Sequence, residues 1–592
     1  MIGIISLLIP PFVCVCIREK IVQKEETALE RMLHYAISLL AHNFVMMLIL
    51  CYGFDSRDNL FGKLNQYNEF ALKYMSLSMV LAVAEPFAER FVRKKVAVTV
   101  KWNRRAGLLD FIFRKRVVGI YAAVLFLLNL ARIFDNNFWG DEAYSLNLIQ
   151  RTVPEIIKGT ASDVHPPLYY MFLRLAYLLF GNQGWAYHLV SLIPCGIIIL
   201  FAMTAFWKKF GAEAAAILIT LACLSGNAVA YNMEVRMYSW GALFVLLCFY
   251  ELYCILQRER ILHYALFVAS SLAAAYTHYY CLLSVAFFYA ALLFLALFRR
   301  RVSLAKAMAS SLCMAAGYLP WFVVLLKTME RIEGNYWITT IPTVKESLRY
   351  LFSNQFKPAA WGALLLGGGT VVLYETGVLR IGRGHEGKIS LCFSAEDAKA
   401  SGVLLWMAAG AASILGTILA AIVVSNAIRP FYVLRYIYPV SVVAWAILAV
   451  IVSRLRGKRL YAVLLLAYML AVFTPAYMSR YRGDRAANER LQETLAATVE
   501  EIGAEDIILT NISHMGWTIA PYYYPENTVK SIDLSALPDL EKGVVYWLIV
   551  KDGQEMEGVR EALGEQGFSS QKVFERGNLG TYPVTIYRIA DF

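Results

Sequence analysis

The sequence has few charged residues for its length. Asp, Glu, Lys and Arg make up 17% of the 592 residues, and hydrophobic residues make up 59%, whereas about 25% charged residues is usual in soluble proteins. A chain this apolar is expected to have lipid as its main solvent. The net charge of +12 would suit nucleic acid only if the basic residues shared one face. They stand instead in short clusters between apolar runs, so we expect no nucleic-acid partner.

Several common sequence signatures are also missing. The ten cysteines lie mostly in apolar runs, none follows Cys392, and their spacing fits neither a disulfide framework nor a zinc site. There is no P-loop, no GxGxxG that opens a helix after a strand, and no internal repeat. The N-terminal MIGIISLLIPPF lacks a basic region and a small-residue cleavage site, so we predict a retained helix rather than a removed signal peptide.

What the sequence does have is long apolar runs. Because a helix needs about 20 apolar residues to cross a bilayer, the runs predict fourteen spans, of which three form an N-terminal module and eleven form a core. The predicted spans are 1–17, 33–52, 70–89, 117–134, 186–206, 213–231, 238–256, 262–278, 280–298, 304–327, 361–379, 401–425, 436–453 and 460–478.

The distribution of Lys and Arg predicts the orientation. The loop 90–116 holds ten basic residues, which the positive-inside rule assigns to the cytoplasm. Alternation along the spans then places five later basic clusters inside as well, namely 208–209, 258–260, 299–301, 380–383 and 454–459. The segment Pro166–Phe180 would reverse this alternation if it crossed. It is short, opens with two prolines and has Arg174 in its middle, so we predict a juxtamembrane or re-entrant helix at the outer interface.

The composition changes near residue 480. Strand-like and helix-like segments alternate there, such as EDIILTN, GVVYWLIV, EGVREALGEQG and YPVTIYRI. We therefore predict a small extracytoplasmic α/β domain at 480–592. It follows a membrane catalytic module at 117–479 and an N-terminal accessory transmembrane module at 1–116. The predicted location is a cell membrane, with the active site on the outer side.

Ionisable residues near membrane helices are costly, so their positions are informative. Asp141 and Glu142 come just after a predicted span, and Asp163 and His165 stand where the chain returns to the interface. A carboxylate there can accept a proton from a hydroxyl or help to hold a divalent cation. The alternative is that Asp141 and Glu142 only cap a short helix that begins at Ala143.

Two further outer turns carry polar residues at the same membrane level. YNMEVRMYSW contains Glu234 and Arg236, which could also be a structural ion pair. YTHYY contains His278 beside Tyr279, and an interfacial aromatic belt with an incidental histidine is the alternative there.

The last outer turn, NAIRPFYVLRYIYP, contains two arginines. Arg429 and Arg435 could bind phosphate oxygens, or they could anchor the chain at lipid headgroups. Their outer position departs from the positive-inside trend, so a topology signal alone does not account for them.

Taken together, these segments resemble a known family. FWGDEAYSLNLI, DVHPPLYYMFLRLAYLLFG, YNMEVRMYSW, YTHYY and LRYIYP, in this order, resemble the bacterial branch of the protein O-mannosyltransferase and aminoarabinose transferase superfamily, glycosyltransferase families 39 and 83, over roughly Val117 to Ser479. The resemblance implies an α-helical polytopic membrane protein of the GT-C fold. It also implies inverting transfer of a sugar from a polyprenyl-phosphate-linked donor to an acceptor hydroxyl of a protein, lipid or polysaccharide.

The resemblance also implies roles for individual residues. It makes Asp141 the general base and Glu142 a residue that orients the acceptor, and it matches Glu234 to the second acidic position. For the donor phosphate it implies Arg236, Arg429 and Arg435. His278 matches a position where some relatives place a metal ligand, which leaves open a divalent metal ion held by His165 and His278, with Asp163 and Tyr279 as further substrate or metal candidates. Relatives that act on lipid A have a lysine where this chain has His165.

Other functions are compatible with the same sequence patterns. A transporter or flippase of a lipid-linked sugar would also be polytopic, but transport sites usually lie at the bilayer midplane and in repeated halves. A ligase or polymerase of surface polysaccharide and a receptor that binds through its C-terminal domain are further alternatives.

Overall fold

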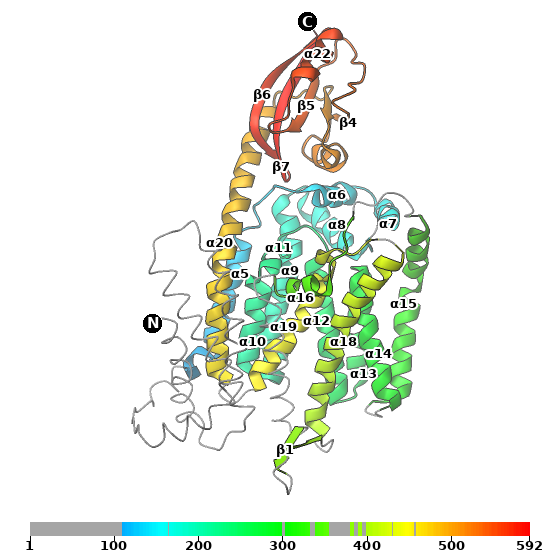
Figure 1. The fold of residues 1–592 in the computed structure, drawn as a ribbon, viewed down its shortest axis with the longest axis vertical. Helices are drawn as coiled ribbons and strands as arrows, with labels where there is room; N and C mark the ends of the chain where they lie inside the picture. The colour runs from blue at the N-terminus through cyan, green and yellow to red at the C-terminus, as the bar shows by residue number, and fades with distance from the viewer. Residues whose placement is uncertain are drawn as a thin grey trace.

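The computed structural model describes residues 109–163, 165–298, 302–331, 338–353, 379–383, 389–393, 398–428, 430–454 and 458–591. It forms a bundle of helices with a small sheet domain beyond one end, and the long helix α20 joins the two (Figure 1). The first three predicted spans and Arg429 lie outside the described residues. So does the predicted span at 361–379, apart from its last residue.

Most of the other predicted spans are helices in the structure. Among the described residues, seven segments are long and apolar enough to cross a membrane, which supports a multi-pass membrane protein: Gly184–Leu224, Tyr238–Gln257, Tyr279–Phe298, Leu304–Thr328, Gly402–Ala427, Leu434–Arg454 and Lys458–Thr498. The helices of the bundle are α5 (Lys115–Leu130), α9 (Gly184–Phe201), π-helix η2 (Ala202–Phe206), α10 (Trp207–Leu224), α12 (Tyr238–Gln257), α13 (Ile261–Ala275), α14 (Tyr279–Phe298), α15 (Leu304–Arg331), α18 (Ala398–Ala427), α19 (Tyr438–Arg454) and α20 (Lys458–Thr498).

The segment Gly184–Leu224 is one run by residue number but two antiparallel helices in space. Gly211, with φ of 92° and ψ of 177°, breaks the helical backbone, a conformation that glycine adopts without strain. On either side of the turn, the Sγ atoms of Cys195 in α9 and Cys223 in α10 lie 3.7 Å apart. The two predicted spans, 186–206 and 213–231, therefore pack against each other.

Three short helices and a turn of helix lie at the bundle end below the sheet domain, hereafter the sheet-side end (Figure 1). They are α6 (Gly140–Ile149), α7 (Val153–Ser162), α8 (Leu168–Phe180) and α11 (Gly226–Tyr231). At 1.5 Å per residue, the 13 residues of α8 span about 20 Å, well short of a bilayer core of about 30 Å. Arg174 of α8 donates a hydrogen bond to the carbonyl of Ile149, 2.8 Å away.

Between α15 and α19, the described residues also form two short helices and a β-hairpin. Helix α16 (Val344–Tyr350) lies close to the 3₁₀-helix η3 (Leu434–Ile437). Strands β1 (Leu379–Arg383) and β2 (Ile389–Phe393) form an antiparallel hairpin. The sequence pattern does not predict this hairpin, because the apolar run before it ends in a short basic segment that is typical of an ordinary connection between spans.

The C-terminal domain is a mixed five-stranded sheet in the order β4-β3-β5-β7-β6. Strand β3 is parallel to β4 and β5, and β7 is antiparallel to β5 and β6. Its elements are β3 (Ile507–Thr510), π-helix η4 (Met515–Ile519), α21 (Ala520–Tyr523), β4 (Thr528–Ser531), β5 (Tyr546–Lys551), α22 (Glu557–Glu565), β6 (Phe568–Leu579) and β7 (Tyr582–Asp591). The prediction of a small α/β domain is confirmed.

Helix α20 connects this domain to the bundle without a break. It runs for 41 residues from Lys458 to Thr498, with Pro475 inside it. The division predicted between residues 479 and 480 falls within this helix, and its C-terminal half packs against strand β6. One continuous helix therefore belongs to both the membrane bundle and the sheet domain (Figure 1).

Candidate active site

Helix α6 is held from two sides. Below it lies the helical bundle, and above it η4 and α21 of the sheet domain pack against it. The Tyr523 hydroxyl donates to the carbonyl of Asn136 at 2.6 Å and accepts the backbone N–H of Phe138 at 2.9 Å. The side-chain amide of Asn147 donates to the carbonyl of Thr518 at 2.9 Å. The contacts of Tyr523 fix the linker just before the N-terminal turn of α6, which carries Asp141, and the contact of Asn147 holds the other end of the helix.

The carboxylate of Asp141 forms an ion pair with Arg435. The Oδ2 atom lies 3.2 Å from an Nη of Arg435, and both side chains are 24% exposed. The guanidinium group lies 5.3 Å from the ring centre of Trp139 and 5.7 Å from that of Tyr436, both within the range of cation–π attraction. The pair is thus held on an aromatic support and remains open to a ligand.

Arg236 braces the same turn from below. It is buried, and its Nη1 donates at 3.0 Å to both the backbone carbonyl of Asp141 and the hydroxyl of Ser145. Its Nη2 lies 3.3 Å from Nε2 of His165. Arg236 therefore positions the backbone of Asp141, while Arg435 contacts the carboxylate.

The contacts of His165 define its tautomer. Because Arg236 can only donate, Nε2 must accept, and the proton lies on Nδ1, 3.4 Å from Oδ2 of Asp163. Burial, followed by the charge of Arg236, lowers the pKa of His165 below its usual value. His165 is therefore a neutral link between Asp163 and Arg236.

His278 lies in an aromatic cluster beside this link. Its ring centre is 5.7 Å from that of His165 and 5.2 Å from that of Tyr436. Its Nδ1 accepts the backbone N–H of Tyr280, whose ring also packs against it. Tyr279 instead turns toward α15, where its hydroxyl accepts the indole N–H of Trp321 at 3.3 Å.

These contacts do not favour a metal ion between the two histidines. Both ring nitrogens of His165 already face hydrogen-bond partners, one of them a guanidinium that would repel a cation. In the described part of the chain, Glu251, Cys254 and His263 form the one group of three potential ligand side chains close enough to share an ion. Glu251 lies 13 residues along α12 from Tyr238, about 20 Å away at 1.5 Å per residue, Cys254 lies further along the same helix, and His263 lies on α13.

Glu142 is buried and binds two backbone N–H groups. Its Oε1 accepts from Val235 at 2.6 Å, and its Oε2 accepts from Trp139 at 3.1 Å, which caps α6. Burial, and then the charge of Glu234, raises the pKa of Glu142 well above its usual value. This geometry matches the capping alternative for Glu142, and it joins α6 to the loop that carries Glu234 and Arg236.

We expect Glu142→Ala to destabilise the protein rather than remove a reacting group. Each lost hydrogen bond from a buried backbone donor costs on the order of 1–3 kcal/mol, so the thermal unfolding midpoint should fall by several degrees. Differential scanning fluorimetry of the purified protein in lipid nanodiscs measures this. An unchanged midpoint with complete loss of activity would instead indicate a direct chemical role.

Glu234 lies in the loop between α11 and α12. Its Oε1 is buried, and no described residue forms a hydrogen bond to it. Burial raises the pKa of Glu234 to about 7, while the charges of Arg435 and Arg236 act in the opposite direction. The charge of this carboxyl group therefore changes near neutral pH.

Some residues that support the candidate site were not predicted from the sequence. His188, at the start of α9, has one ring nitrogen 2.6 Å from the carbonyl of Asp135 and the other 2.5 Å from that of Met233, so it ties the two polar loops together. Trp139 and Ser145 support Arg435 and Arg236. Ser145 stands four residues after Asp141 on the same helix face, a spacing that could have indicated it.

The structure thus brings most of the predicted residues to the sheet-side end of the bundle. Those that meet around α6 are Asp141, Glu142, Asp163, His165, Glu234, Arg236, His278 and Arg435. Tyr279 faces away, and Arg429 lies outside the described residues.

This arrangement of helices, with a polar site below a C-terminal domain, is the GT-C glycosyltransferase fold. Similar structures are those of ArnT from Cupriavidus metallidurans, in the apo state and bound to undecaprenyl phosphate. Their TM-scores are 0.50 and 0.51, with 14% and 15% sequence identity, and each match covers 80% of this chain and 97% of the other. No family model matches the sequence, and no curated protein matches it.

Proposed function

We propose that the protein is a membrane glycosyltransferase that moves a sugar from a polyprenyl-phosphate-linked donor to an acceptor hydroxyl, with inversion at the sugar carbon. The observation that carries the proposal is the ion pair between Asp141 and Arg435, open to ligand within a GT-C fold. A base and a cation that face each other suit a reaction in which a hydroxyl loses a proton while a phosphate leaves. The undecaprenyl phosphate in one ArnT structure supports a donor of this class.

In the proposed mechanism, the donor phosphate displaces Asp141 as the counter-ion of Arg435. The released carboxylate then accepts the proton of the acceptor hydroxyl. The hydroxyl oxygen forms a bond to the anomeric carbon as the bond from that carbon to the phosphate oxygen breaks. The phosphodiester carries one negative charge and the departing phosphate carries two, so Arg435 stabilises charge that develops in the transition state.

Other residues position these two groups. Arg236 holds the backbone of Asp141, and Glu142 holds the turn before it. Trp139 orients the guanidinium of Arg435. Arg429 remains a proposed second phosphate contact. The chemistry needs no nucleotide, because the lipid phosphate is itself the leaving group.

We also propose that this site faces the outside of the cell membrane. The basic cluster at Lys208 and Lys209 begins α10, and that at Arg258 and Arg260 follows α12, so both lie at the helix ends away from the sheet-side end. The positive-inside rule favours the cytoplasm for those ends. An outside-only thiol reagent should label cysteine placed at exposed Ala486 in intact cells.

A direct test uses the purified protein in nanodiscs. We expect saturable binding of undecaprenyl phosphate, and in membranes that lack the protein we expect its lipid-linked sugar to accumulate, as detected by mass spectrometry. Failure of undecaprenyl phosphate to bind would contradict the proposal. If the protein were instead a flippase, a lipid-linked sugar would change leaflet without being consumed.

The charge of Glu234 predicts a pH dependence of donor binding. Below pH 7 the carboxyl is largely neutral, and as the pH rises through about 7 it ionises near Arg435. The added negative charge opposes an anionic ligand, so undecaprenyl phosphate should bind more weakly at pH 8 than at pH 6 relative to Glu234→Gln. If the ionised Glu234 carboxylate repels the bound phosphate by about 1 kcal/mol, the affinity for undecaprenyl phosphate falls roughly fivefold.

The second ionisation of the phosphate is common to both proteins, so the ratio of their affinities isolates Glu234. Isothermal titration at several pH values measures it. A ratio that does not change between pH 6 and pH 8 would contradict the assignment of this titration to Glu234.

A further inference from the structure

A cavity of about 350 Å³ lies beside the ion pair, between the linker that joins α5 to α6 and the C-terminal half of α20. This volume lies in the range of roughly 300–1,000 Å³ that is common for small-molecule sites. Trp139 and Glu234 line it on the side toward the active site, and Arg480, Arg485 and Asn488 line it on the side of α20. One wall of the cavity is therefore built by the helix that enters the sheet domain.

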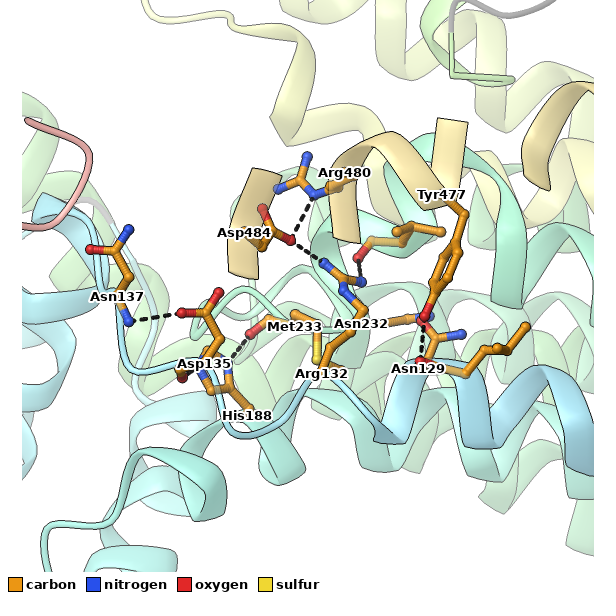
Figure 2. Close-up of polar contacts among 12 residues, drawn as sticks. Asn129, Arg132, Asp135, Asn137, His188, Asn232, Met233, Tyr477, Arg480 and Asp484 are labelled. Carbon is orange, nitrogen blue, oxygen red and sulfur yellow. Dashed lines mark hydrogen bonds and ion pairs between the residues drawn. The ribbon is translucent and has the colours of Figure 1, made fainter. Parts of the chain in front are cut away.

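The polar groups of the cavity are fixed by a network that Figure 2 shows. Arg132 is buried and donates to Asp484 at 2.7 Å and to the carbonyl of Val229 at 2.6 Å. Arg480 lies 3.7 Å from the same Asp484 carboxylate. Asp135 accepts the backbone N–H of Asn137 at 3.0 Å. The α5–α6 linker and α20 thus form one rigid frame around the cavity.

The charges of this cavity do not favour strongly ionic ligands. Each of the three arginines that line it already faces a carboxylate: Arg132 and Arg480 face Asp484, and Arg485 faces Glu489. An anion would have to displace an existing ion pair, and the arginines oppose a cation. These residues offer hydrogen-bond acceptors and donors together, and a hydroxyl group can use both. Glu234 adds a buried Oε1 to which no described residue donates, and Trp139 adds an apolar ring. A neutral group with many hydroxyls, such as a sugar ring, satisfies this lining best.

The position of the cavity distinguishes donor from acceptor. A sugar bonded directly to a phosphate at Arg435 must touch the ion pair, but neither Asp141 nor Arg435 lines the cavity. Among the residues that line the cavity, those nearest the pair are Trp139, whose ring lies against the guanidinium of Arg435, together with Glu142 and Glu234. The cavity is therefore separated from the Asp141–Arg435 pair by the side chains of residues such as Trp139. This is where the part of an acceptor next to its reacting hydroxyl would lie.

We infer that this cavity binds a sugar residue of the acceptor, so that the acceptor is a glycan or a glycolipid rather than an unmodified protein. This inference rests on the proposed transferase function and specifies its substrate class. The acceptor hydroxyl would then extend past Trp139 to Asp141, while the donor phosphate occupies Arg435.

The test fills the cavity by one substitution and compares it with a matched control on the same helix. Ala487 lines the cavity, whereas its neighbour Ala486 is exposed and does not. The probes are methyl glycosides of glucose, mannose, galactose and N-acetylglucosamine, observed by saturation-transfer NMR with the full-length protein in nanodiscs. We expect the wild type and Ala486→Trp to bind at least one of them, and Ala487→Trp to bind it at least tenfold more weakly.

A second pair of variants guards against misfolding of Ala487→Trp. Arg485 lines the cavity and Arg482 does not, and both are exposed on α20. We expect Arg485→Ala to weaken glycoside binding roughly fivefold, as for the loss of one hydrogen bond, and Arg482→Ala to leave it unchanged.

Undecaprenyl phosphate binding is measured in parallel and separates the two proposals. It should be equal in Ala487→Trp and Ala486→Trp, and its absence from the wild type would count against the transferase function itself. Two results would overturn the acceptor site alone, provided that undecaprenyl phosphate still binds. One is that the wild type binds no glycoside, and the other is that both tryptophan variants bind the glycoside equally well. Displacement of the glycoside by undecaprenyl phosphate glucose would place the donor sugar there and also overturn it.

Discussion

Replacing Asp141 with asparagine is expected to lower the turnover number for sugar transfer by at least about 100-fold and by up to about 10,000-fold, the range usual for loss of a general base. The amide has nearly the same shape but cannot accept the proton of the hydroxyl. Because the carboxylate also competes with phosphate for Arg435, we expect Asp141→Asn to bind undecaprenyl phosphate as tightly as the wild type or several-fold more tightly. Steady-state transfer assays and equilibrium binding measure the two effects.

A lower turnover number together with an unchanged or higher affinity for undecaprenyl phosphate is the result that identifies Asp141 as the base. Asp141→Glu serves as the conservative control and should retain part of the activity, because it keeps a carboxylate near the reacting oxygen. Normal turnover by Asp141→Asn would remove Asp141 as the base. Loss of undecaprenyl phosphate binding by the same variant would indicate instead that the carboxylate organises the donor site.

Replacing Arg435 with alanine is expected to impair both donor binding and turnover. The guanidinium contacts the position assigned to the phosphate, and its charge is needed most as the phosphate gains its second negative charge. Removing one such group costs roughly 100-fold to 1,000-fold in rate in comparable sites. Arg435→Lys keeps the charge but loses the planar stacking on Trp139, so partial activity is expected.

The control for Arg435 is Arg151→Ala, since Arg151 is exposed near the end of α6 and no described contact joins it to the site. It should bind undecaprenyl phosphate normally. If Arg435→Ala raised the Michaelis constant for the acceptor as much as that for the donor, the phosphate role would be wrong.

Much of the helical architecture could be predicted because apolar runs near 20 residues leave few alternatives in lipid. The short length of Pro166–Phe180 and its central arginine predict a helix that does not cross, and α8 is a 13-residue helix whose Arg174 donates a hydrogen bond to the carbonyl of Ile149 in α6. The hairpin β1–β2 and strand β6 could not be predicted, because their stability comes from pairing with a partner strand rather than from a local pattern.

The site was predictable to the extent that charge near lipid is costly. Because of that cost, Asp141, Arg236 and Arg435 could be identified as candidates, and these residues lie far apart in the chain but close together in the structure. The hydrogen-bond partner of each charged residue could not be predicted in this way. Arg236 binds the backbone of Asp141 rather than Glu234, and Glu142 binds two N–H groups, because these choices depend on how loops from different helices pack.

The contacts above α6 also constrain how the molecule is assembled. Asn147 bonds to Thr518, 371 positions further on, and Asn137 accepts a hydrogen bond from Asn578, 441 positions further on. Such distant partners leave the ribosome long after the helices around them, and closing loops of this length is slow. The turn that carries Asp141 therefore acquires its final support only when nearly the whole polypeptide has been synthesised, so a chain truncated before residue 518 would insert its helices without completing this turn.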